Sequence, residues 1–331
     1  MKIAIVKTSA LGDIIHASFV PSLLKKHLPN VQIDWIITQD LAEILENHPH
    51  IDNIIALPYS SQASPWTTMK GLWQFSWLKH PHYDYIFDLQ SLIKSAFISY
   101  LLPGKRVGFS PRGCREQLAS LSYNCRHDIA YSTSIFERNL FLFTQQLQKD
   151  IPPTYKEPDT NKHLHFTKKA AKHIQKYLQP NKKHILFIPG ASTMKKVYSP
   201  ARYAKVIDNL CAHKYHFSIA WGNAKEQHLA TQIHSQCQTN KPDILNKRLS
   251  FDHLKALIDC SDLVIGSDTG PVHLAWALKT PSIVLFATSN PASAERNHLT
   301  TTINKAISAT SMHTISTASI LKQIKSLLDK K

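Results

Sequence analysis

The chain has 331 residues, enough for roughly two domains, and its 43% hydrophobic and 19% charged residues are typical of a globular protein and exclude a disordered chain. Lysine and arginine outnumber aspartate and glutamate by 39 to 23, a net charge of +16 that favours an anionic partner such as nucleic acid, a membrane surface or a phosphorylated substrate. Five cysteines without a CxxC pair argue against a disulfide scaffold or structural zinc site and indicate a cytosolic protein.

Short apolar runs alternate with amphipathic stretches through the first 150 residues. We expect strands at 3–6, 33–38, 54–57, 85–89 and 106–109, and helices at 13–26, 94–102 and 133–147. Strands separated by helices predict βαβ units and a parallel sheet that is covered on both faces.

A proline-rich segment without periodicity, residues 150–164, is the best candidate for a linker. The alternation then resumes, with strands at 184–188, 217–221, near 244, 263–266 and 282–286, and helices at 168–178, 200–212, 224–234, 251–258 and 271–278. We therefore expect an N-terminal domain over 1–150, a second domain over 165–315, and a C-terminal helix within 316–331 that could pack back on the first domain.

Two doubly wound domains bind ligands at the carboxyl ends of their strands, so the loops after the strands are the places to look for chemistry. The first such loop runs from Lys7 to Asp13, and Asp13 stands at the start of a helix after the lone Gly12. Its carboxylate could cap that helix. Alternatively, it could accept a proton from a substrate hydroxyl.

The loop after the predicted strand 263–266 is denser in functional residue types. Gly270 permits a tight turn and Pro271 suits a first helical position. The amides of this helix start and the Thr269 hydroxyl form a candidate phosphate site, to which His273 could add a donor. The structural alternative is that Asp268 caps the helix and His273 lies on its surface.

Two further loops of the second domain carry candidate groups. Ser192, Thr193 and Lys196 follow the strand 184–188, and hydroxyls beside lysines suit a pyrophosphate. Glu226, after the strand 217–221, could bond ribose hydroxyls, or could only stabilise the first turn of a helix.

In the first domain a set of basic residues suits an anionic acceptor, although each could also be a solvated surface residue. The set comprises Lys94, Arg106, Arg112, Arg115 and Arg126. The sequence has no DxD or HExxH pattern, which gives no indication of a divalent metal, and it lacks the GxGxxG and Walker loops.

The segments KTSALGD at 7–13 and SDTGPVH at 267–273 together resemble the lipopolysaccharide heptosyltransferases of glycosyltransferase family 9. The segments DLQSLIKSA at 88–96 and REQLASL at 115–121 are most similar to the heptosyltransferase I group. The resemblance implies an α/β fold of the GT-B type, with two Rossmann-like domains whose parallel sheets face each other across a cleft.

The resemblance also implies an activity: inverting transfer of L-glycero-D-manno-heptose from ADP-heptose to Kdo of the lipid A inner core. It implies no cofactor and a cytoplasmic enzyme at the anionic inner-membrane surface. Asp13 would be the general base. The donor would be bound by Ser192, Thr193, Lys196, Glu226, Leu249, Asp268, Thr269, Gly270 and His273. The acceptor would be bound by Lys7, Ser9, Gly12, Lys94 and Arg115.

Two other functions remain open from the sequence. A heptosyltransferase II would differ only in its acceptor, a heptose in place of Kdo. A basic nucleic-acid-binding protein would cluster basic and aromatic residues on one face, whereas here the basic residues are spread along the chain and no binding motif is present, so we expect no nucleic-acid partner.

Overall fold

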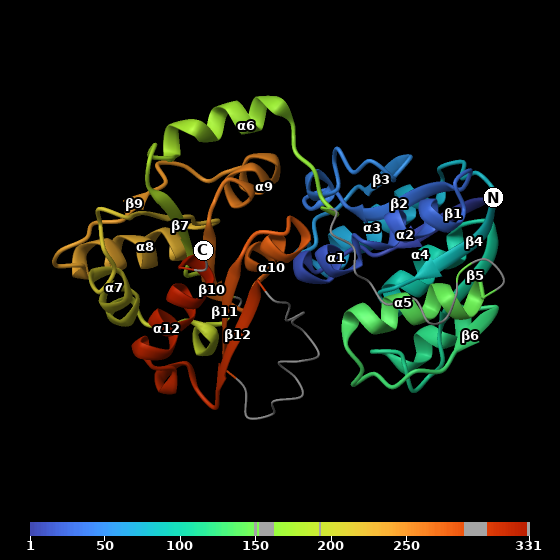
Figure 1. Cartoon of the computed structure of the whole chain (residues 1–331). Coiled ribbons are helices and arrows are strands. Elements are labelled where there is room, and N and C mark those ends of the chain that lie inside the picture. Colours follow the sequence, from blue (N-terminus) through green and yellow to red (C-terminus); the bar gives the residue numbers. More distant parts are fainter. Residues whose placement is uncertain (149–150, 152–161, 192, 288–302, 330–331) are drawn as a thin grey trace. The chain divides into compact units, whose positions relative to one another are not determined.

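The chain forms two compact units, Met1–Leu164 and His165–Lys331. The computed structural model describes residues 1–148, 151, 162–191, 193–287 and 303–329 (Figure 1). Most of the segment expected as a linker lies outside the described residues.

The first unit is built on a six-stranded, all-parallel sheet. Its strands are β1 (Lys2–Val6), β2 (Gln32–Thr38), β3 (Asn53–Leu57), β4 (Tyr83–Asp88), β5 (Gly104–Phe109) and β6 (Cys125–His127). Their order, β3-β2-β1-β4-β5-β6, is the 3-2-1-4-5-6 order of the Rossmann fold. The predicted parallel sheet is confirmed, and β6 is a strand that the sequence pattern did not reveal.

Helices cover both faces of this sheet. They are α1 (Leu11–Ala17), α2 (Val20–His27), α3 (Pro65–Ser76), α4 (Ile93–Leu101) and α5 (Ile135–Gln146), with the 3-10 turns η1 (Ala42–Ile44) and η2 (Gln117–Ser122). On one face, Phe75 of α3 and Ile98 of α4 share a core with Ile86. On the other, Phe143 of α5 stacks on Phe87, with ring centroids 4.1 Å apart.

The single helix expected at 13–26 is two helices. Pro21 lies in the first turn of α2, where its missing N–H costs nothing, but the same residue cannot donate to a preceding helical turn. The Ser18 hydroxyl donates to the carbonyl of Ile15 and closes α1. Helix α3 was also not predicted, because its sequence is apolar on two sides and therefore lacks a simple amphipathic period.

The second unit repeats the same topology. Its strands are β7 (Lys183–Ile188), β8 (Tyr215–Ile219), β9 (Asp243–Ile244), β10 (Leu263–Ser267), β11 (Ser282–Ala287) and β12 (Asn304–Ala309). Their order, β12-β11-β10-β7-β8-β9, becomes 3-2-1-4-5-6 when β7 is counted as the first strand and the sheet is viewed from its other edge. Strand β12 was not predicted.

The helices of the second unit are α6 (Lys168–Ile174), α7 (Pro200–Asp208), α8 (Ala224–Gln236), α9 (Phe251–Asp259), α10 (Gly270–Ala277) and α12 (Thr317–Leu328), with η3 (Gln175–Tyr177), η4 (Met194–Lys196) and η5 (Met312–Thr314). Helix α12 packs against α7 and the sheet. Its apolar side chains Ile320, Ile324 and Leu328 lie in the core of this unit. The apolar face of the C-terminal helix is therefore part of the core of the second unit.

Parallel strands end at one edge of their sheet, and ligands bind where the strand order reverses. In the first unit that point lies between the ends of β1 and β4, and in the second between the ends of β7 and β10. Among the described residues, no helix is both long and apolar enough to cross a bilayer.

Candidate active site

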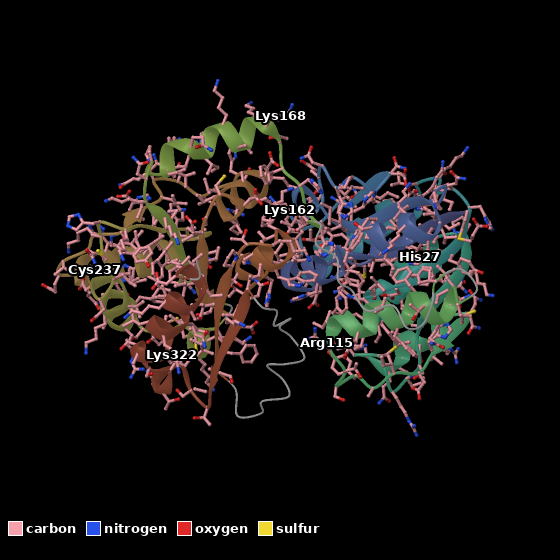
Figure 2. The ribbon with its side chains drawn as sticks, viewed as in Figure 1. His27, Arg115, Lys162, Lys168, Cys237 and Lys322 are labelled. Carbon is pink, nitrogen blue, oxygen red and sulfur yellow. The ribbon has the colours of Figure 1, made fainter. Side chains whose placement is uncertain are left out.

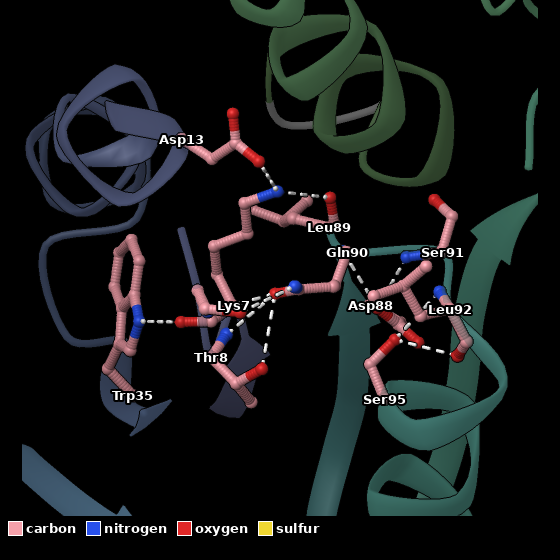
Figure 3. A network of polar contacts seen from close by, with 11 residues as sticks. Lys7, Thr8, Asp13, Trp35, Asp88, Leu89, Gln90, Ser91, Leu92 and Ser95 are labelled. Carbon is pink, nitrogen blue, oxygen red and sulfur yellow. Dashed lines mark hydrogen bonds and ion pairs between the residues drawn. The ribbon is translucent and has the colours of Figure 1, made fainter. Parts of the chain in front are cut away.

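Lys7 is the first residue after β1, and its side chain is buried. Its ammonium donates to the carbonyl oxygen of Leu89, 3.1 Å away, at the end of neighbouring β4. The same nitrogen lies 3.5 Å from Oδ2 of Asp13 (Figure 3). Lys7 therefore joins the ends of two central strands and holds the Asp13 carboxylate by charge.

Asp13 lies in the first turn of α1 without capping it. The N-cap position belongs to Ala10, and no side chain caps this helix. The capping interpretation of Asp13 is therefore wrong. One third of its side chain (34%) remains exposed, so the carboxylate is both held by Lys7 and accessible to a substrate. Gly12 precedes it in the same turn and is half-buried.

Gln90 ties the loop after β1 to the loop after β4. Its Oε1 accepts hydrogen bonds from the backbone amides of Thr8 (2.9 Å) and Ser9 (3.1 Å), and its Nε2 donates to the Ser9 hydroxyl (3.1 Å). The sequence pattern did not indicate a role for Gln90. One signal could have identified Gln90: it is a polar residue directly after the buried strand predicted at 85–89, which pairs with the first strand.

Beneath Gln90, Asp88 fixes the loop after β4. Its carboxylate accepts hydrogen bonds from the amides of Gln90 and Ser91 and from the hydroxyl of Tyr123. Complete burial raises the pKa of Asp88, while these hydrogen bonds act in the opposite direction. Asp88 is thus a positioning group that is closed off from solvent.

Lys94 lies in the first turn of α4, and Arg115 lies in the loop before η2. The Lys94 ammonium lies 5.3 Å from the ring centroid of Tyr59. Burial lowers the pKa of Lys94, and the charges of Asp40 and Glu116 oppose this shift. Arg115 is exposed at the surface (Figure 2). Its neighbour Glu116 accepts a hydrogen bond from the Ile93 amide (2.6 Å), which brings this loop to the start of α4.

In the second unit, Asp268 follows β10 and contacts two basic side chains. Its Oδ2 lies 2.9 Å from the Lys196 ammonium and its Oδ1 lies 3.1 Å from Nε2 of His273. Burial alone would raise the pKa of Asp268, but the hydrogen bonds and charges of His273 and Lys196 outweigh it and lower the pKa to about 2. The structure therefore brings together three of the predicted donor residues.

The structural alternatives for this loop are wrong. The N-cap of α10 is Thr269, without a side-chain cap bond, so Asp268 does not cap the helix. His273 is buried, not on the helix surface. The Thr269 hydroxyl donates to the carbonyl of Ser267 (3.3 Å), and Gly270 opens the helix.

Glu226 lies in the first turn of α8, the helix that follows β8. Its carboxylate accepts hydrogen bonds from the Gly222 amide (2.7 Å) and the Asn223 side chain (2.8 Å). It packs on Gly190, where an added Cβ would lie 2.5 Å from the Glu226 carboxyl carbon. Counted from β7, this is the end of the second strand, where Rossmann folds place the acid that binds ribose.

The remaining predicted donor residues are less constrained. Thr193 is exposed at the start of η4, one turn from Lys196. Leu249 is half-buried in the loop before α9. Ser192 lies outside the described residues. In the part of the chain that the structure describes, no three His, Cys, Asp or Glu side chains are grouped to hold a metal ion.

Two Rossmann-like units in one chain form the GT-B architecture, a fold of nucleotide-sugar glycosyltransferases. The model of "Glycosyltransferase family 9 (heptosyltransferase)" matches residues 74–325. Lipopolysaccharide heptosyltransferase 1 of Campylobacter coli is 32% identical over 313 residues, covering 93% of this chain and 89% of that protein.

Two solved structures from Escherichia coli share the fold. Heptosyltransferase WaaC with ADP superposes with a TM-score of 0.80 at 22% identity, over 99% of this chain and 100% of that one. ADP-heptose lps heptosyltransferase II has a TM-score of 0.77 at 20% identity, over 99% and 98%. The chain belongs to glycosyltransferase family 9, and it is a heptosyltransferase of lipopolysaccharide core synthesis.

The depressed pKa of Asp268 predicts an acid-dependent contribution to stability. Because the folded-state pKa of about 2 lies below the unfolded value of 3.8, the contribution is complete above about pH 4 and is lost as the pH falls through 2. We expect Asp268→Asn to lose about 2 kcal/mol of unfolding free energy at pH 7, and its difference from the wild type to shrink between pH 4 and pH 2. Denaturant unfolding at several pH values measures this, and a difference independent of pH would contradict it.

Proposed function

We propose that the enzyme transfers L-glycero-D-manno-heptose from ADP-heptose to a Kdo hydroxyl of the lipid A inner core, with inversion at the anomeric carbon. The observation that carries the proposal is the Asp13 carboxylate, which is held by Lys7, accessible to solvent, and not used as a helix cap. The 32% identity to a lipopolysaccharide heptosyltransferase 1 supports this acceptor class.

The second unit would bind the nucleotide sugar. Glu226 in the first turn of α8 can accept hydrogen bonds from the ribose, since a carboxylate has more acceptor sites than its two present partners occupy. Lys196 has three donor hydrogens, of which Asp268 takes one, so the others can bind the diphosphate. Thr193, Leu249, Thr269 and Gly270 would line the same donor site, and Ser192 is proposed with them.

Asp268 would act through its partners and not by touching phosphate. A carboxylate facing a diphosphate would repel it, whereas a carboxylate behind Lys196 and His273 fixes both donors. Helix α10 begins beside this cluster at Gly270. The backbone N–H of Gly270 is available to the diphosphate, whereas Pro271, the next residue, has no N–H. These groups would stabilise the negative charge that develops on the leaving ADP.

The first unit would supply the base and hold the acceptor. Asp13 would take the proton of the acceptor hydroxyl while that oxygen forms the new bond to the anomeric carbon and the bond to the ADP oxygen breaks. Attack from the side opposite the leaving group inverts the anomeric carbon. Lys7, Ser9 and Gly12 adjoin Asp13, and Lys94 and Arg115 would pair with the acceptor's carboxylate and phosphate groups.

Replacing the proposed base should remove chemistry but not donor binding. We expect Asp13→Asn to lower the transfer rate by about 10²–10⁴-fold, since this is the usual contribution of a positioned base. The affinity for ADP-heptose, measured by calorimetry, should be unchanged. Asp84→Asn, an exposed aspartate of the same unit, is the control and should retain full activity. A turnover close to wild type in Asp13→Asn would remove Asp13 as the base.

Lys196 and its neighbour Lys195 form a matched pair for the donor site. Both lie in η4, but only Lys196 is paired with Asp268. We expect Lys196→Ala to weaken ADP-heptose binding by about tenfold or more, because it removes a charge-assisted hydrogen bond. Lys195→Ala removes the same charge and should change the affinity little. Equal losses in both variants would indicate a general effect of charge and refute the assignment.

The acceptor is tested by the product. Incubation of the purified enzyme with ADP-heptose and Kdo-lipid A, followed by mass spectrometry, should show one added heptose. A parallel reaction with heptosyl-Kdo-lipid A tests the heptosyltransferase II alternative, which the similar TM-scores of the two Escherichia coli structures leave open. Transfer only to the heptosylated acceptor would overturn the proposed substrate.

A lipid-anchored acceptor would place the reaction at a membrane surface. We infer that the enzyme associates peripherally with the cytoplasmic face of the inner membrane, and the net charge of +16 supports attraction to anionic lipids.

A further inference from the structure

Helix α3 exposes a row of large apolar side chains to solvent. Trp66, Met69, Trp73 and Trp77 follow one another at helical spacing on or just after α3, and the three tryptophans are 73%, 63% and 73% exposed. The rings of Trp73 and Trp77 touch edge to face, with centroids 5.7 Å apart. Exposed apolar groups gathered in this way usually mark a site of interaction.

The orientation of α3 is fixed by its other side. Phe75 is fully buried in the core of the first unit, and Gly71 packs so closely on Tyr59 that an added Cβ would lie 2.5 Å from its ring. At the start of the helix, the Ser64 hydroxyl accepts a hydrogen bond from the Thr67 amide. The tryptophans are therefore presented by an anchored helix.

The exposed apolar surface extends over the neighbouring elements. Helix α4 turns Ile93, Phe97 and Tyr100 outward, at the spacing of one helical face, and η2, which packs against α4, exposes Leu118 and Leu121. Helices α3 and α4 pack on the same core of the first unit, through Phe75 and Ile98. Together, the exposed apolar side chains of α3, α4 and η2 make up the apolar face.

The same part of the chain is poor in acidic residues. From residue 58 to residue 127 the sequence has only three, Asp84, Asp88 and Glu116, and Asp88 is buried. The same stretch has eight basic residues: Lys70, Lys79, Lys94, Lys105, Arg106, Arg112, Arg115 and Arg126. Lys70 and Lys79 are exposed beside the tryptophans. The apolar face therefore lies in a positively charged setting.

We propose that the apolar face of α3, α4 and η2 docks on an anionic lipid bilayer, with the tryptophans inserted at the level of the headgroups. Tryptophan has an apolar ring and one polar N–H, which suits the interface between lipid and water. Basic residues around it gain from the negative surface potential. This inference rests on the proposed function, because a lipid-anchored acceptor requires the enzyme to work at such a surface.

The apolar face adjoins two of the proposed acceptor residues, Lys94 and Arg115. Ile93 precedes Lys94 in the first turn of α4, and Glu116 connects the Arg115 loop to the Ile93 amide. A bilayer bound to the face would therefore meet the protein next to Lys94 and Arg115. The headgroup of a lipid acceptor would reach the loops of Asp13 and Gln90 without leaving the membrane.

Sedimentation with vesicles tests the proposal. The wild-type protein should bind vesicles of phosphatidylethanolamine and phosphatidylglycerol, bind phosphatidylcholine vesicles less, and dissociate as salt is added. Brominated acyl chains should quench its tryptophan fluorescence. The variant Trp66→Ser/Trp73→Ser/Trp77→Ser should keep its circular dichroism spectrum and bind at least about tenfold more weakly.

A charge-matched pair separates local from general attraction. Lys70→Gln/Lys79→Gln should weaken binding to the anionic vesicles by about tenfold or more. Lys322→Gln/Lys325→Gln removes the same charge from exposed positions of α12 in the second unit (Lys322 is labelled in Figure 2) and should have little effect. Equal losses in both pairs would overturn the local docking surface.

Two further results would overturn the proposal: wild-type protein that does not bind the anionic vesicles, or a triple tryptophan variant that binds as well as wild type. A concentration-dependent dimer that the triple variant abolishes, without vesicle binding, would assign the face to a second copy of the chain. Vesicle binding is measured without substrates, so it does not depend on activity.

A separate measurement distinguishes the docking surface from the proposed function. Transfer to a deacylated, water-soluble acceptor should be unchanged in the triple variant. If the wild-type enzyme did not transfer heptose to this acceptor, the result would count against the proposed function instead.

Discussion

The chemistry of each unit depends on one constraint of parallel sheets, that all strands end at the same edge. In the first unit the reversal of strand order leaves the ends of β1 and β4 side by side, and Lys7 and Gln90 close the two loops onto each other. In the second unit the same reversal sets β10 beside β7, and Asp268 emerges there. Asp13 and Lys196 have defined positions because these neighbouring loops hold their partners.

Both candidate clusters contain a lysine–aspartate pair, but the two pairs differ in which of the two side chains is exposed. In the first unit the lysine is buried and the aspartate is partly exposed, so the carboxylate is presented to a substrate. In the second the aspartate is buried and the lysine is more exposed, so the ammonium is presented. A presented carboxylate suits proton transfer from an alcohol, and a presented ammonium suits a diphosphate. The inverse arrangement fits the proposed division into an acceptor unit and a nucleotide unit.

The distribution of positive charge along the chain is more informative than the net charge. Basic residues between residues 58 and 127 accompany an exposed apolar face on α3, α4 and η2. The sheet beneath explains why α3 is apolar on two sides, since Phe75 faces the core while Trp73 faces outward. A helix with this composition would be costly on a surface that meets only water, which is why we assign it a lipid partner.

Much of the fold could be predicted from the sequence, because buried parallel strands are short apolar runs and most helices between them have apolar residues at helical spacing. The loop with Asp13 and the loop with Asp268 were found because both follow such strands. The sequence did not reveal α3 or β12, the break between α1 and α2, or the role of Gln90, because these depend on what packs beside them. Local residue patterns thus determined the alternation of strands and helices and the loops that carry polar groups. The pairing of Lys196 with Asp268 was decided by tertiary structure, because these residues are far apart in sequence and meet only where β7 and β10 are neighbours. The pairing of Lys7 with Asp13 was likewise decided by tertiary structure, because it depends on the conformation of the loop between them.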